Sequence, residues 1–181
     1  MFYTTNTEST FVLSGVAIEN AADSEFLLRC TGNSNQRGWG TAGNNGADCH
    51  FTGIGQVLEG TVIWDSISQL DLYLTQGSTL TGAVVDDESN AGGGGDGYAN
   101  LYIDSNSCWV VTGDSALTSL ACAGELVDAD GNAVTVVGND GTIYRTGSSP
   151  YTVTVASYTA EPDLSGASTA DHWDHYAVER P

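Results

Sequence analysis

Four carboxylates lie close together in one glycine-rich stretch of this 181-residue chain. Asp86, Asp87, Glu88 and Asp96 fall within eleven residues and flank four consecutive glycines. Calcium takes about six to eight oxygen ligands, often from acidic loops made flexible by glycine. The stretch is therefore a candidate calcium site, although its spacing matches neither an EF-hand nor the repeated glycine-aspartate motif of calcium-binding β-rolls. The other interpretation, which this spacing favours, is a solvated acidic insertion.

Aromatic residues at outward positions form a second candidate site, for sugars. Tyr73, Tyr102 and Trp39 could stack on sugar rings, while Asp71 and Asn100 could hydrogen bond to sugar hydroxyls. The alternative is structural, because tyrosine suits any pleated surface and Trp39 could close the side of the fold. Near the C-terminus, Asp171–His175 reads DHWDH, in which His172 and His175 could ligate zinc or nickel on a helical turn. A disordered polar tail is the favoured interpretation there.

Cysteines occur as two close pairs, Cys30 with Cys49 and Cys108 with Cys122. Neither pair has CxxC spacing, which disfavours a zinc ribbon or a thioredoxin-like site. Two local disulfides are the simplest pairing and would indicate export from the cytoplasm. Buried free thiols are the alternative, and a reactive cysteine is a third.

Charge excludes several functions. The formal net charge is −19, from 23 acidic residues and four arginines, and lysine is absent. No basic surface exists to bind nucleic acid or an anionic membrane, and lysine-dependent catalysis is excluded. No apolar run approaches the roughly 20 residues that a membrane span requires. Without a nucleophile elbow or an evident pair of converging catalytic carboxylates, we expect no enzymatic activity.

Short β-runs separated by Gly, Asn, Asp and Ser dominate the chain and predict an all-β fold. Leu70–Gly82 resembles Ala99–Gly113, and such self-similarity predicts a solenoid of stacked strand-turn units. Strand alternation then sets which way each side chain points. Inward positions are Phe26, Leu28, Cys30, Cys49, Phe51, Leu70, Leu72, Leu74, Leu101, Ile103, Trp109 and Val111. Outward positions are Arg29, His50, Asp71, Tyr73, Tyr102 and Cys108. On adjacent units, Tyr73 and Tyr102 would lie about 5 Å apart.

Three segments depart from this pattern. Asp86–Gly97 is expected to form a long flexible loop, since four glycines cannot hold a strand. Residues 125–158 carry Asp-Gly hairpin signals and would cap the solenoid formed by residues 1–124. The polar, acidic residues 159–181 are predicted to be a loosely ordered tail.

Four sequence segments resemble the C-terminal part of secreted bacterial proteins with a right-handed parallel β-helix, the pectin-lyase-like fold. They are Phe2–Asn20, Arg37–Ala47, Glu59–Val84 and Cys108–Gly131. The resemblance implies an adhesin-like or carbohydrate-binding protein outside the cell or on its surface. It also implies that this chain belongs to a longer β-helix protein, which accounts for the lack of a signal peptide before Phe2.

These observations together predict a secreted or cell-surface β-helix module without enzymatic activity. Its role would be structural or adhesive, with polysaccharide as the expected ligand. A calcium-dependent carbohydrate-binding module is the first alternative, and a polysaccharide lyase or hydrolase is the second.

Overall fold

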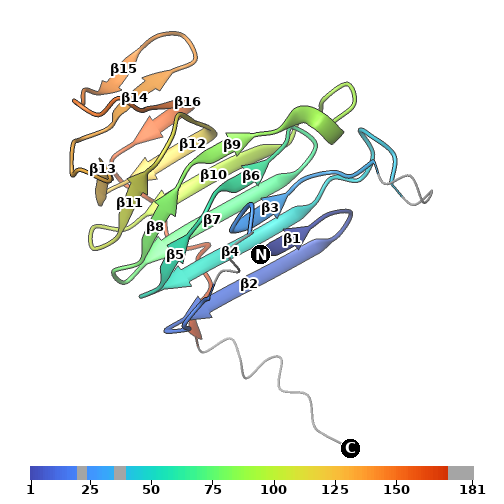
Figure 1. Cartoon of the computed structure of the whole chain (residues 1–181), viewed down its shortest axis with the longest axis horizontal. Helices are drawn as coiled ribbons and strands as arrows, with labels where there is room; N and C mark the ends of the chain where they lie inside the picture. The colour runs from blue at the N-terminus through green and yellow to red at the C-terminus, as the bar shows by residue number, and fades with distance from the viewer. Residues whose placement is uncertain (20–23, 35–39, 171–181) are drawn as a thin grey trace, which may run out of the picture.

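The computed structural model describes residues 1–19, 24–34 and 40–170. Their strands form three sheets, which we call A, B and C (Figure 1). Sheet A contains β1 (Phe2–Thr4), β3 (Leu28–Cys30), β6 (Val62–Trp64) and β9 (Val84–Asp86). Sheet B contains β2 (Glu8–Ser14), β4 (Asp48–Ile54), β7 (Gln69–Thr75), β10 (Tyr98–Ile103), β12 (Ser115–Cys122), β16 (Thr152–Thr159), β14 (Thr135–Gly138) and β15 (Ile143–Arg145). Sheet C contains β5 (Val57–Glu59), β8 (Thr79–Gly82), β11 (Cys108–Val111) and β13 (Glu125–Asp128). The all-β prediction is confirmed.

The chain visits the three sheets in a fixed order. β3, β4 and β5 lie in sheets A, B and C, and the same order recurs in β6–β7–β8 and β9–β10–β11. Neighbouring strands from successive passes pair in parallel, so that Phe51, Leu72, Leu101 and Leu120 stand in one row of sheet B. Each pass therefore places equivalent residues one strand further along the same sheet.

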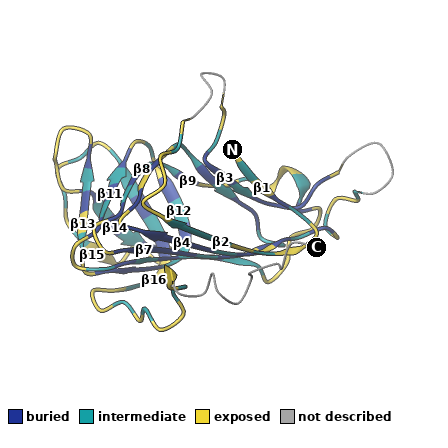
Figure 2. Ribbon diagram, turned by 90° about the horizontal axis from the view of Figure 1, so that it is seen from below, coloured by how far each residue is buried: buried dark blue, intermediate teal, exposed yellow. Residues whose placement is uncertain are grey.

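Buried apolar residues from all three sheets form one core cluster, and Figure 2 shows the buried stretches of the ribbon in dark blue. The predicted inward residues of β4, β7, β10 and β11 are all buried, which confirms the strand alternation. At the corner after β7, buried Ser78 accepts a hydrogen bond from the Gln56 amide at 3.0 Å, and its own amide donates to Ser107 at 3.1 Å. The Ser78 hydroxyl gives the buried Gln56 amide a partner, and the Ser78 amide also donates to the Thr75 carbonyl at 3.2 Å. One inward prediction is wrong, because Phe26 is only half-buried while its neighbour Leu27 packs in the core.

The Asp86–Gly97 segment, for which the sequence predicts a long flexible loop, contains one turn of helix and contacts the preceding pass of the chain. Asp87 caps a 3-10 helix, η1 (Glu88–Asn90), and the Gly97 amide donates to the Ser66 carbonyl at 2.7 Å. Gly92 and Gly94 adopt positive φ values of 63° and 78°, so the glycines provide turn conformations that other residues rarely adopt.

Residues beyond β13 complete one end of the molecule. β14 and β15 form an antiparallel hairpin, while β16 pairs in parallel with both β12 and β14. Beyond β16, residues 160–170 lie against the outer face of sheet B, where the Ser168 amide donates to Thr52 Oγ1 at 3.1 Å. We call residues 160–170 the covering segment. The sequence predicts a loosely ordered tail over residues 159–181, and the covering segment is the part of it that contacts sheet B.

Candidate functional site

An aromatic stack stands on the outer face of sheet B. Tyr73 of β7 and Tyr102 of β10 are in register, with ring centroids 4.4 Å apart and an interplanar angle of 6°. His50 of β4 adds a tilted ring with its centroid 5.0 Å from that of Tyr73. The predicted external Tyr73–Tyr102 pair is therefore confirmed, and the stacking follows from parallel strands whose equivalent residues repeat at about 4.8 Å.

Asp71 connects the polar residues beside this stack. Its carboxylate accepts hydrogen bonds from Tyr98 Oη at 3.2 Å, Asn100 Nδ2 at 3.0 Å and Tyr102 Oη at 3.4 Å. Ser119 extends the network by donating to Asn100 Oδ1 at 2.6 Å. Burial and the neighbouring Asp71 carboxylate raise the pKa of Tyr98 to about 12, so its phenol remains a neutral donor. Asp71 and Asn100, the predicted polar pair, are hydrogen bonded to each other. Their other hydrogen bonds are formed with the neighbouring Tyr98, Tyr102 and Ser119 side chains.

The covering segment hides one member of the stack. Tyr73 points to the outer face, yet its exposed fraction is only 6%. Gly166 lies so close that a Cβ atom there would stand 2.4 Å from Tyr73 Oη. Tyr73 is therefore unavailable for ligand stacking, contrary to the prediction, and Tyr102 is the half-buried ring that remains accessible.

A cavity of about 310 Å³ opens beside Tyr102. Its lining consists of Tyr102, Ser119, Leu120, Ala121, Ser157, Tyr158, Thr159, Glu161 and Asp163. Tyr73 occupies one side of the Tyr102 ring, and the next residue in the row on the other side is Ala121, followed by Thr159. The small Ala121 side chain leaves space beside the free ring face, and hydroxyl and carboxylate groups surround that space.

The sequence did not identify Ser119, Glu161 and Asp163 as site residues. Ser119 is in register with Asn100. Knowledge that β12 pairs with β10 would therefore have identified Ser119 as a site residue. Glu161 and Asp163 belong to the segment interpreted as a tail. The Ser165 amide donates to Asp163 Oδ1 at 2.9 Å, and a local turn of this kind is encoded by the Asp-x-Ser spacing.

The predicted calcium ligands do not gather into one cluster within the described residues. Asp87 forms an ion pair with Arg29 at 2.5 Å and accepts from the Ser89 hydroxyl, while Glu88 accepts from the Ser66 amide and hydroxyl at 2.7 and 2.6 Å. Asp96 is exposed. Within residues 1–19, 24–34 and 40–170, no three His, Cys, Asp or Glu side chains gather in a way that could hold a metal ion. The carboxylates instead fasten η1 to the preceding passes of the chain.

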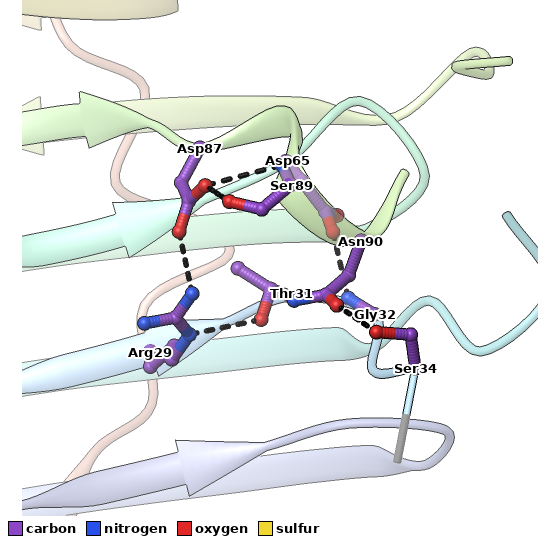
Figure 3. A network of polar contacts seen from close by, with 8 residues as sticks. All are labelled: Arg29, Thr31, Gly32, Ser34, Asp65, Asp87, Ser89 and Asn90. Carbon is purple, nitrogen blue, oxygen red and sulfur yellow. Dashed lines mark hydrogen bonds and ion pairs between the residues drawn. The ribbon is translucent and has the colours of Figure 1, made fainter. Parts of the chain in front are cut away.

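A fifth carboxylate lies below η1. Asp65 is fully buried, and its Oδ2 accepts from the Gly32 amide at 2.7 Å (Figure 3). Its Oδ1 has no hydrogen-bond partner among the described residues. Nearby, burial and a hydrogen bond with Glu88 raise the pKa of Asp86 to about 6.

The predicted disulfides are absent, because all four cysteines are free thiols. Cys108 is on the half-exposed outer side of β11, whereas Cys122 is in register with the core residue Ile103 and is buried. Those two side chains therefore point to different faces. Cys30 and Cys49 are both buried in the core, where a hydrogen bond between the thiols and burial raise the pKa of Cys30.

Trp39 and the Asp171–His175 motif lie outside the described residues. In the part of the chain that the structure describes, no helix is long and apolar enough to cross a membrane. Comparison of the chain with protein-family models, curated proteins and solved structures finds no match.

Proposed function

We propose that this chain is a β-helix module without enzymatic activity, located outside the cell, that binds polysaccharide through the cavity beside Tyr102. The recurring order of sheets A, B and C supports a solenoid. Right-handed winding agrees with the strong preference for right-handed connections between parallel strands and with the resemblance to secreted β-helix proteins. The location outside the cell is based on that resemblance.

The observation that carries the binding proposal is that Tyr102 and the small Ala121, which are in register, line one cavity. Sugar-binding surfaces combine an aromatic face for the ring C–H groups with polar groups for the hydroxyls, and the residues around Tyr102 provide both. The volume of about 310 Å³ is at the lower end of the roughly 300–1,000 Å³ typical of ligand pockets. It suits one sugar residue at a time, which is how a chain end or a side branch of a polysaccharide would engage.

Calorimetry with a panel of oligosaccharides, preceded by a glycan array, tests this proposal. We expect Tyr102→Ala to weaken binding on the order of tenfold, since loss of a stacking aromatic costs about 0.5–1.5 kcal/mol beyond its buried area. Tyr102→Phe retains the ring and should retain most of the affinity. Ala121→Leu fills the space beside the ring and should block binding without removing any polar contact.

Tyr3→Ala serves as the matched control, because Tyr3 is a 50% exposed tyrosine on β1, away from the cavity. Circular dichroism checks that each variant folds. Unchanged affinity in both Tyr102→Ala and Ala121→Leu would refute the site, and absence of any retained glycan would refute the function.

We also propose that further strands of a longer protein continue the stack at the end formed by β1, β2 and β5. These strands are the outermost members of sheets A, B and C at that end, and Met1, Tyr3, Val16 and Val57 expose large apolar surface there. An unpaired edge of this kind favours pairing with other strands. Hydrogen exchange should find the β2 amides more protected in a longer protein than in this chain, and equal protection would contradict the proposal.

A further inference from the structure

Two carboxylates of the covering segment line the cavity that contains the Tyr102 ring. Glu161 and Asp163 are both exposed, and none of the residues that line the cavity is basic. Among the described residues, the one ion pair is that between Arg29 and Asp87, and neither of them lines the cavity. The two carboxylates therefore have no cationic partner in the described part of the chain.

Local hydrogen bonds keep one of these carboxylates charged. The Ser165 amide donates to Asp163 Oδ1 at 2.9 Å, and this bond together with one from the Ser165 hydroxyl lowers the pKa of Asp163. The formal net charge of −19 adds a negative potential around the whole molecule. An acidic sugar entering the cavity would meet repulsion at close range, whereas a cationic sugar would be attracted.

We infer that the cavity selects a sugar residue with a free, protonated amino group. This inference rests on the proposed sugar-binding function and names the class of sugar. The sugar ring would lie on Tyr102 above Ala121, and its ammonium group would pair with Glu161 and Asp163. Ser119 and Ser157, which line the same cavity, would serve the hydroxyls. Charge-assisted hydrogen bonds are about twice as strong as neutral ones, so the amine would dominate selectivity.

Two oligosaccharides that differ in one group provide the test. Oligomers of glucosamine and of N-acetylglucosamine share a backbone, but only the former carries a free amine. Calorimetry at slightly acidic pH, where that amine is protonated, should give an affinity on the order of tenfold higher for the glucosamine oligomer. Added salt should reduce the difference, because screening weakens pairs near the surface.

Variants that remove negative charge test whether Glu161 and Asp163 cause the preference for the glucosamine oligomer. Glu161→Gln combined with Asp163→Asn should abolish the difference in affinity between the two oligomers. Glu8→Gln combined with Glu25→Gln removes the same charge at exposed positions outside the cavity and should preserve the difference.

Each outcome decides one question. Equal binding of the two oligomers overturns the amino-sugar inference and leaves the proposed sugar-binding function standing. Loss of the preference in the Glu8→Gln, Glu25→Gln control also overturns the inference, because total charge would then suffice. If neither these oligomers nor any other glycan binds, the proposed function itself fails.

Discussion

Tyr73 and Tyr102 stack face to face at 4.4 Å, yet only Tyr102 is accessible from outside. The stack arises because the two residues occupy equivalent positions on adjacent parallel strands. The difference in exposure arises because the covering segment lies over Tyr73 at Gly166, whereas beside Tyr102 its residues Glu161 and Asp163 line an open cavity. Tyr73 thereby supports the ring that faces the cavity, and a ligand would contact Tyr102.

Gly166→Ala should detach the covering segment from sheet B. The added methyl group would stand 2.4 Å from Tyr73 Oη, and Tyr73 cannot move aside because its ring is stacked on Tyr102. Overpacking of this kind costs about 1–3 kcal/mol. Hydrogen exchange should report faster exchange in residues 160–170. Gly93→Ala is the control, since a methyl group there meets nothing within 4 Å; similar exchange in both variants would contradict the contact.

Asp71→Asn should destabilise the outer network and alter the titration of Tyr98. The amide has a single acceptor oxygen for three donors, and unpaired polar groups of this kind cost about 1–2 kcal/mol in the free energy of unfolding. The pKa of Tyr98, raised to about 12 by burial and by Asp71, should fall toward its ordinary value because a nearby negative charge is removed. Ultraviolet titration of the phenols measures this change. Asp96→Asn removes an exposed carboxylate elsewhere and should leave the Tyr98 titration as it is.

Asp86→Asn should change how stability depends on pH. The pKa of Asp86 in the folded chain is raised from 3.8 to about 6, so the folded state holds a proton there that the unfolded state has lost between those values. This contribution stabilises the fold below about pH 4 and is lost as the pH rises through about 6. The free energy of unfolding of Asp86→Asn relative to the parent chain should therefore increase from pH 4 to pH 7. Parallel curves for the two proteins over that range would contradict the raised pKa.

Asp65→Asn should preserve most of the stability of the protein, whereas Asp65→Ala should not. Asp65 is fully buried, and its Oδ2 accepts a hydrogen bond from the Gly32 amide at 2.7 Å. Asparagine retains an oxygen for the Gly32 amide. Asp65→Ala loses that acceptor and should destabilise by about 1–3 kcal/mol. Chemical denaturation measures both, and a more stable alanine variant would contradict the importance of the Gly32 bond.

Millimolar calcium should leave the thermal midpoint unchanged. Asp87 and Glu88 are engaged with Arg29 and Ser66 rather than directed toward a common point. A ligand that binds only the folded state raises the midpoint once its concentration exceeds its Kd. A calcium-dependent rise that is absent with magnesium would revive the calcium-dependent module that the sequence offered as an alternative.

The sequence by itself determined the local structure of the sheets. Alternation of apolar and polar residues in Leu70–Leu74 and in Leu101–Ile103 predicted which side chains enter the core. The similarity of two segments predicted that Tyr73 and Tyr102 stack. These features depend on the two-residue period of a strand and on repetition, and both can be read directly from the order of residues.

Only the tertiary structure decided what lies on the outer face. Residues 160–170 carry no strand period, and their position against Tyr73 depends on the course of the chain after β16. The pairing of Arg29 with Asp87 joins residues 58 positions apart, and it fastens a segment that the sequence presented as an acidic insertion with a candidate calcium site. Cys108 and Cys122 likewise separate because β11 and β12 belong to different sheets, with Cys108 on the outer side of sheet C and Cys122 in the core beneath sheet B. Contacts between segments that are distant in sequence follow from how the passes stack, which local residue patterns do not encode.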